Sequence, residues 1–204
     1  MGMMPIMMIS SVTSLLNAID FWGLKLFFQN TGLTKLFEQI NAMTISIVAI
    51  YVAVLTSYKL AINLKHEPLN ATIVGLMSFF LLTNLSIEGK TQFLNIIDLG
   101  SAGIFVAMIG GLLGTRLYIF FIEKKLTIKM PESVPLVVQK TFESIIPGVL
   151  VALFIGIIFS LVSLTSQGNM ITLINTLLQK PLLSLGSNIF AAMFIVAFIE
   201  LIWF

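Results

Sequence analysis

The feature that most constrains this sequence is its set of long apolar segments. Residues Ile145 to Leu164 contain no charged side chain at all. A helix of about 20 apolar residues matches the ~30 Å hydrocarbon thickness of a bilayer. The whole chain is 58% hydrophobic and 10% charged, whereas soluble domains are about 45–50% apolar and about 25% charged. The sequence therefore predicts an all-α integral membrane protein.

The hydrophobic runs predict about six transmembrane helices. They occupy Met1–Ala18, Met43–Tyr58, Leu69–Leu82, Gly103–Ile122, Ile145–Leu164 and Ile189–Phe204. Aromatic and polar residues alternate over residues 20–40, which predicts two short interfacial helices that meet near Asn30–Gly32. A further surface helix, ending before Pro181, is predicted from an apolar stripe at Ile171, Ile174, Leu177 and Leu178.

This pattern divides the chain into four segments. Residues 1–40 hold the first transmembrane helix and the interfacial helices, and residues 41–122 hold transmembrane helices two to four. Residues 123–144 form a charged connection that contains the sequence TIKMP. Residues 145–204 hold the fifth helix, an interfacial helix and a sixth helix that stops inside its apolar run. We therefore expect the chain to represent part of a larger membrane protein.

The distribution of lysines predicts the orientation in the membrane, because lysine-rich loops stay in the cytoplasm. The connections after the second and fourth helices contain six lysines: Lys59, Lys65, Lys124, Lys125, Lys129 and Lys140. Those after the first, third and fifth helices contain four: Lys25, Lys35, Lys90 and Lys180. We expect the lysine-richer connections, and with them the N-terminus, to lie in the cytoplasm.

Residue counts exclude several kinds of chemistry. The chain has no cysteine and one histidine, which leaves neither thiolate sites nor a histidine metal cluster. His66 lies between Lys65 and Glu67 without an acid–base pattern, so we interpret it as an ordinary loop residue. The net charge of +2 does not indicate a nucleic-acid partner. We expect no metal and no cofactor, and no catalytic residue is identifiable.

Small residues form a stripe on the fourth predicted transmembrane helix. Their spacing of about one helical turn lets two helix backbones approach closely. The main interpretation is packing between helices of one subunit, and a dimer seam or a sliding face stays open as the alternative. The stripe consists of Gly103, Ala107, Gly110, Gly111 and Gly114.

Two charged residues, Arg116 and Glu200, lie inside predicted transmembrane helices. Such a charge costs about 3 kcal/mol at the bilayer centre and often marks a substrate pathway. Arg116 precedes Glu123 by seven residues, about 10 Å of helix. It can therefore reach the cytoplasmic surface or a partner, and a functional role is the alternative. Glu200 has no cationic neighbour in the sequence, so we interpret it either as a substrate contact or as paired with a segment outside this chain.

The charged connection carries the most specific pattern. Pro131 and Pro135 favour extended backbone at the residues before them, and Val137, Val138 and Phe142 then recur at helical spacing. The pattern predicts a stiff cytoplasmic segment that leads into an amphipathic helix. An ordinary connecting loop is the alternative interpretation.

The same residues resemble a known family. The run TIKMPESVPLVVQKTFESIIP, residues 127–147, resembles the cytoplasmic connection of the membrane (IIC) components of bacterial sugar phosphotransferase systems (PTS), in the lactose/cellobiose/diacetylchitobiose branch. The stretch GIFVA at residues 103–107 is similar to the start of a family helix, and LIWF at 201–204 resembles the residues just ahead of the family's Gly-Ile-His-Gly substrate motif. The motif residues in the connection are Thr127, Lys129, Met130, Pro131, Pro135, Phe142 and Pro147.

The resemblance implies the N-terminal half of a ten-span, homodimeric permease of a phosphoenolpyruvate-dependent system. Such a permease translocates a β-linked disaccharide such as cellobiose or diacetylchitobiose. Cytoplasmic IIB and IIA subunits provide for the phosphorylation of the sugar. The family's sugar-binding His and Glu lie in the second half, so we expect this chain to be inactive alone. Arg116 stands where the resemblance implies an acidic residue. A non-transporting dimerisation scaffold or remnant, and an unrelated secondary transporter, are the alternative interpretations.

Overall fold

Helices make up most of the chain. The computed structural model describes residues 2–18, 24–83, 85–88, 91–128, 131, 134–165, 168–179 and 193. The helices are α1 (Met4–Ala18), α2 (Leu24–Thr31), α3 (Leu33–Ala42), α4 (Val48–Asn63), α5 (Pro68–Leu82), α6 (Ile96–Leu99), α7 (Ile104–Glu123), α8 (Leu136–Glu143), α9 (Ile145–Ser163) and α10 (Met170–Ile174). Short helical turns η1 (Ile45–Ile47), η2 (Ser101–Gly103) and η3 (Asn175–Gln179) join some of them, and one hairpin contains β1 (Leu85–Glu88) and β2 (Thr91–Leu94).

The long apolar helices confirm the predicted membrane protein. Within the described residues, three helical segments are long and apolar enough to cross a bilayer: Leu33–Asn63, Ser101–Glu123 and Val138–Ser163. The helices α1 and α5 are apolar but shorter, with 15 residues each. These helices overlap the first five hydrophobic runs of the sequence, but the segment Leu33–Asn63 also includes α3, which the sequence predicted as an interfacial helix. The predicted sixth helix lies outside the described residues, apart from Met193.

Local sequence signals explain where several helices begin and end. The helix α5 begins at Pro68, and the Glu67 carboxylate accepts hydrogen bonds from the backbone N–H groups of Leu69 and Asn70, both at 3.1 Å. Such a cap satisfies amide groups that have no partner inside the helix. Between α2 and α3, Gly32 adopts φ +76°, a conformation that glycine takes without strain. The predicted junction of two short helices near Asn30–Gly32 is confirmed.

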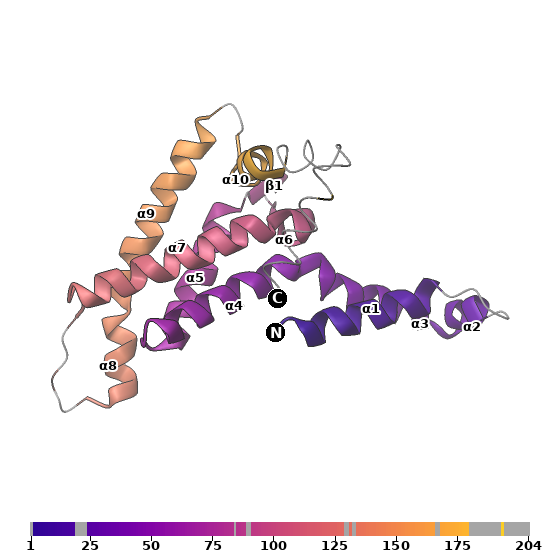
Figure 1. Ribbon diagram of the computed structural model, residues 1–204, viewed down its shortest axis with the longest axis horizontal. Helices are drawn as coiled ribbons and strands as arrows, with labels where there is room; N and C mark the ends of the chain where they lie inside the picture. Colours follow the sequence, from indigo (N-terminus) through magenta and orange to yellow (C-terminus); the bar gives the residue numbers. More distant parts are fainter. Residues whose placement is uncertain are drawn as a thin grey trace.

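The centre of the molecule is formed by α4, α5 and α7, which pack side by side (Figure 1). The helix α9 packs across α5 and α7, while α1 and α3 form an arm that extends away from this centre (Figure 1). The largest fully buried apolar side chains are Phe79, Leu82, Val106, Ile119, Val151 and Ile155. The opposite face of α9 exposes Val149, Leu153, Ile157 and Leu161, a continuous apolar surface of the kind that a bilayer covers.

Residues 84–100, which the sequence predicted only as a polar connection, contain a hairpin and a short helix. The strands β1 and β2 pair antiparallel, with Leu85 opposite Leu94 and Glu88 opposite Thr91. The Asn95 side chain then caps α6 by accepting a hydrogen bond from the backbone N–H of Ile97 at 3.1 Å. The predicted all-α architecture therefore carries one small β-element at the end of α5.

The predicted helix before Pro181 is helical from Met170 to Gln179, where this described stretch ends. The helix α10 ends at Ile174 and continues as the π-helical turn η3. Ile171 and Ile174 are buried, and α10 contacts α7 and α9, whereas Leu177 is exposed. The apolar stripe therefore serves partly to attach α10 to the helices of the core.

Candidate functional site

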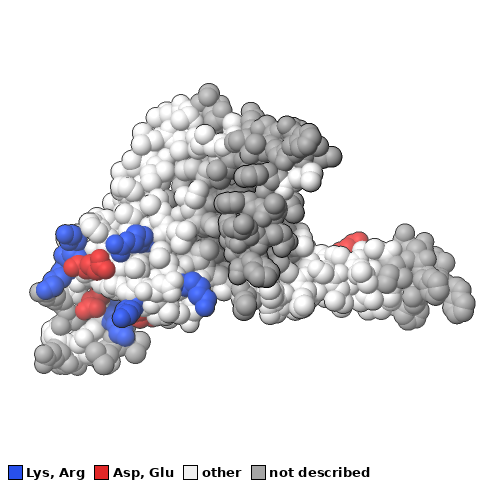
Figure 2. Space-filling model, viewed as in Figure 1, with Lys and Arg blue, Asp and Glu red and all other residues white. Residues whose placement is uncertain are grey.

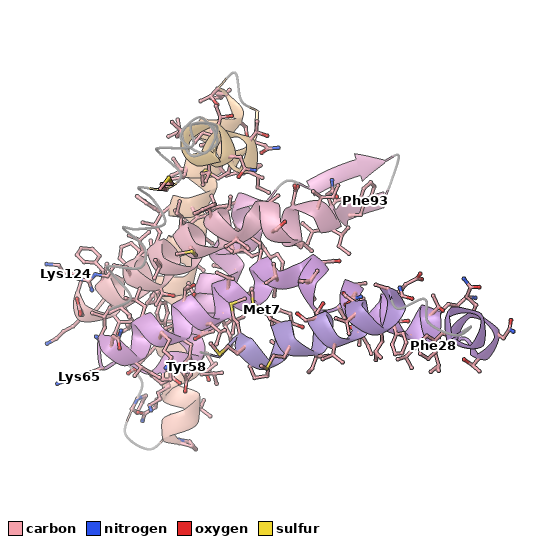
Figure 3. The ribbon with its side chains drawn as sticks, turned by 45° about the vertical axis from the view of Figure 1, so that its right-hand side comes forward. Met7, Phe28, Tyr58, Lys65, Phe93 and Lys124 are labelled. Carbon is pink, nitrogen blue, oxygen red and sulfur yellow. The ribbon has the colours of Figure 1, made fainter. Side chains whose placement is uncertain are left out.

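Charged side chains gather at one end of the molecule, where α4 and α7 end and where α5 begins (Figure 2). We call this region the charged end and define it by His66, Glu67, Glu123, Lys124, Lys140 and Glu143. Figure 3 places Lys65 and Lys124 together at this end, whereas Phe28 lies at the far end of the arm. The connections that follow α4 and α7 therefore lie on the same side of the helix bundle.

One carboxylate at the charged end lies between two basic side chains. His66 Nε2 lies 3.3 Å from Glu123 Oε1, and Arg116 Nη1 lies 3.9 Å from Glu123 Oε2. All three side chains are partly exposed to solvent, and exposed ion pairs contribute only about 0–1 kcal/mol. The sequence interpretation of His66 as an ordinary loop residue did not include this partner, which is 57 residues away.

A small polar cavity lies beside this ion-pair cluster. It has a volume of about 130 Å³ and is lined by His66, Glu67, Asn70, Tyr118, Ile122, Lys140 and Glu143. Ligand pockets for small molecules typically have volumes of about 300–1,000 Å³, so this cavity is too small for a disaccharide. In the described part of the chain, no group of three His, Asp or Glu residues is arranged to bind a metal.

The glycine-rich stripe of α7 faces α4 and α5 of the same chain. A Cβ atom at Gly111 would lie 2.9 Å from both Ser57 Oγ and Thr56 Oγ1, and one at Gly110 would lie 3.1 Å from the Cα of Phe79. A Cβ atom at Gly114 would collide with Ser78. At the N-terminal end of the stripe, Gly103 packs against the Asp98 carbonyl, and Ala107 is fully buried.

Hydroxyl groups hold the same interface together. The Ser57 hydroxyl donates a hydrogen bond to the Gly111 carbonyl at 3.2 Å, and the Thr115 hydroxyl donates to the Ala71 carbonyl at 3.2 Å. Both side chains are fully buried. Within the described residues, every buried side-chain nitrogen or oxygen has a hydrogen-bond partner. The buried hydroxyls Ser57 and Thr115 are therefore used in contacts within the helix bundle.

The structure describes part of the charged connection, residues 123–144. Gln139 on α8 donates hydrogen bonds through Nε2 to the carbonyls of Pro131 and Val134, at 3.1 and 2.9 Å. These bonds fix the segment between the two prolines against the predicted amphipathic helix, which begins immediately after Pro135. Thr127 is half-buried, Phe142 is exposed on α8, and Pro147 is buried in the first turn of α9. Lys129, Met130 and Glu200 lie outside the described residues.

Arg116, the other intramembrane charge predicted from the sequence, lies on the outer face of α7. Its side chain is 54% exposed and points away from the interior that contains the glycines. Its ion-pair partner among the described residues is Glu123, and the choice between a structural and a functional role for Arg116 stays a prediction. No described residue places Arg116 beside a cavity large enough for a sugar.

Comparisons with known proteins agree with this architecture. The family described as "Phosphotransferase system, EIIC" matches residues 1–204. The chain is 29% identical to a cellobiose-specific EIIC component of Geobacillus stearothermophilus, a match that covers 98% of this chain and 47% of the relative. It is 32% identical to an oligo-beta-mannoside-specific EIIC component of Bacillus subtilis (strain 168), over 80% of this chain and 38% of the relative.

A solved structure shows the same fold. The crystal structure of the transporter ChbC, the IIC component of an N,N'-diacetylchitobiose-specific phosphotransferase system, matches with a TM-score of 0.85 and 28% sequence identity. That match covers 98% of this chain and 50% of the solved chain. The present chain thus spans about half the length of the proteins that it matches.

Proposed function

The chain belongs to the EIIC family of the phosphotransferase system, and from this premise we propose that it forms the scaffold part of a sugar permease for a β-linked disaccharide such as cellobiose or diacetylchitobiose. The observation that carries the proposal is the fold match, over 98% of the chain, to the diacetylchitobiose-specific IIC component. The 29% identity to a cellobiose-specific component over the same share of the chain supports it independently.

The assignment of a scaffold role comes from the interior of the helix bundle. Its buried hydroxyls are all used in contacts between or within helices, and the polar cavity of about 130 Å³ is smaller than a disaccharide site. The larger cavities, of about 440 and 330 Å³, are lined mostly by apolar side chains, so we expect a sugar site to need residues beyond those described. The chain supplies the rigid helices against which such a site is built.

The partners and the orientation follow from the same proposal. Cytoplasmic IIB and IIA subunits phosphorylate the sugar, the permease is a homodimer, and the N-terminus lies in the cytoplasm. The common position of the lysine-containing ends of α4 and α7 supports this orientation, because it gathers the basic connections on one side of the membrane (Figure 3). The glycine stripe is occupied inside the chain, so a dimer has to use other surfaces.

A chimaeric permease tests the proposed function. Residues 1–204 replace the matching part of the Geobacillus stearothermophilus cellobiose-specific component, and cells that lack their own cellobiose uptake receive the chimaera with the cognate IIB and IIA subunits. We expect phosphoenolpyruvate-dependent uptake of labelled cellobiose at a measurable fraction of that of the natural component.

Two controls make the result of this experiment decisive. Membrane insertion and monodispersity of the chimaera in detergent show whether it folds. An uptake assay of the same chimaera without phosphoenolpyruvate shows whether uptake depends on phosphorylation. A folded, inserted chimaera that takes up no cellobiose would contradict the proposed scaffold role.

A further inference from the structure

The outer face of α7 is an apolar stripe that contains one cation. The exposed residues recur every three or four positions along the helix: Phe105, Met108, Ile109, Leu112, Arg116 and Phe120. The opposite face of α7 carries the buried glycines and packs on α4 and α5. Arg116 therefore lies within a surface that is otherwise suited to lipid acyl chains.

The guanidinium of Arg116 has little of its binding capacity used. Its ion-pair partner among the described residues is Glu123, at 3.9 Å, and the other oxygen of that carboxylate lies 3.3 Å from His66. A guanidinium carries five N–H donors in a planar fork. Several donors thus remain for a partner on the outer side of α7.

The position of Arg116 along α7 sets the depth of its guanidinium in the bilayer. Arg116 lies seven residues before the end of α7 at Glu123, which corresponds to about 10 Å of helix. An arginine side chain at that depth can extend to the headgroup region while its methylene groups stay in the apolar layer. Its natural environment is therefore the boundary between acyl chains and phosphates.

A second cation borders the same stripe. Lys124 Nζ lies 5.7 Å from the centre of the Phe120 ring, within the range of a cation–π contact. Phe120 follows Arg116 by one helical turn, so Lys124 lies near the same end of the stripe. With the Glu123 carboxylate shared between Arg116 and His66, positive charge predominates at this end of the stripe.

We propose that Leu112, Arg116, Phe120 and Lys124 form a binding site for an anionic phospholipid. The headgroup phosphate binds the Arg116 fork with Lys124 beside it, and one acyl chain follows Leu112 and Ile109. Phosphate matches the planar fork of arginine in geometry and charge. A protein surface would instead have to bury the guanidinium and supply a new carboxylate, which makes lipid the better occupant.

Lipid selectivity measured by spin-label spectroscopy tests this site. The chain is reconstituted in phosphatidylcholine vesicles that contain spin-labelled phosphatidylglycerol, and the protein-bound fraction of label is compared with that of labelled phosphatidylcholine. We expect Arg116→Gln to lower the preference for phosphatidylglycerol about fivefold, since one basic residue near the surface contributes about that factor. Arg116→Lys keeps the positive charge but lacks the planar guanidinium, so it should retain an intermediate preference for phosphatidylglycerol.

The variant Lys59→Gln is the matched control, because it removes one exposed charge from the last turns of α4. We expect it to leave most of the preference intact. Equal losses in Arg116→Gln and Lys59→Gln would overturn the proposal, because a diffuse surface charge would then explain the binding.

A second measurement leaves Arg116 unchanged. A photo-reactive benzoylphenylalanine at Leu112 should form adducts with phospholipid in the reconstituted chain. Adducts that join two copies of the chain instead would identify this face as a protein interface and overturn the lipid site.

Discussion

Asp98 is a carboxylic acid whose protonation is coupled to folding. It lies in the short helix α6, and burial raises the pKa of its carboxyl above the ordinary value of 3.8. A raised pKa means that the charged form is less favourable in the folded state than in the unfolded state. The stability associated with the neutral form is fully present below pH 3.8, and it is lost as the pH rises through the raised value.

The variant Asp98→Asn should therefore unfold at a slightly higher temperature at neutral pH and match the natural chain at pH values below the ordinary pKa. Thermal unfolding in detergent between acidic and neutral pH measures this difference. The exposed Glu38 on α3 provides a control, because Glu38→Gln removes the same charge from a surface position. Lower stability of the Asp98→Asn variant at neutral pH would contradict the proposed effect of burial.

At the scale of single residues, the sequence indicates which side chains need a partner better than it indicates which residue that partner is. Arg116 lies 3.9 Å from Glu123, a partner that the sequence offers seven residues away, and its role stays a prediction. The contact between His66 and Glu123 spans 57 residues, and no local pattern encodes such a distance. The buried hydroxyls of Ser57 and Thr115 were also not predicted, since a serine or threonine in an apolar run does not show which carbonyl it will bind.

Among the elements, α7 depends most on small side chains. A Cβ atom at Gly111 would lie within 3.0 Å of Ser57, Thr56 and the Ala53 carbonyl, and Ala107 is fully buried one turn away. Overpacking a close interface typically costs about 1–3 kcal/mol per site. We therefore expect Ala107→Leu combined with Gly111→Leu to lower the thermal stability of the chain in detergent strongly.

The variant Gly156→Leu on α9 is the matched control, because a Cβ atom there would meet no other atom within 4 Å. It also replaces a glycine in an apolar helix by leucine, but it should leave the unfolding temperature almost unchanged. Fluorescence-detected size-exclusion after heating measures both variants. Equal stability of the two variants would show that the α7 stripe does not control helix packing.

Long helices were predicted well and short elements poorly, for a physical reason. The ends of α5, α7 and α9 follow from the length of each apolar run, because a bilayer selects for length, whereas α4 begins and ends five residues later than the predicted helix Met43–Tyr58. The hairpin at residues 85–94 has strands of four residues each. Its alternation of Leu85 and Ile87 followed by Gly89 is the usual signal of a hairpin, yet it is too short to stand out beside the helices.

For the whole molecule, the main prediction concerns transport by the chain alone. We expect cells that express only residues 1–204 to take up no labelled cellobiose or diacetylchitobiose above background. The reason is that the cavity at the charged end, of about 130 Å³, is too small for a disaccharide, and the larger cavities of about 440 and 330 Å³ are lined mostly by apolar side chains. Phosphorylation-dependent uptake by such cells would contradict this expectation, and detection of the chain in the membrane fraction controls for expression.

The arrangement of the helices in space could not be predicted from one sequence. The stripe of Gly103, Ala107, Gly110, Gly111 and Gly114 indicated a close contact but not its partner helices. The first five hydrophobic runs each overlap a described helix, but their order along the chain does not fix which helices touch. The choice of α4 and α5 as neighbours of α7 depends on the shapes of residues far away in the sequence, such as Ser57 and Phe79.

The shortness of α5 has a consequence for the surrounding membrane. Its 15 residues span only about 22 Å at 1.5 Å per residue, against about 30 Å of hydrocarbon in a typical bilayer. Its outward face exposes Leu69, Ile73 and Leu81, while the charged end and the hairpin lie at its two termini. A bilayer accommodates such a short helix by local thinning, by extension of flanking side chains or by association with other helices, so we expect the stability of the chain to depend on the acyl-chain length of the surrounding lipid.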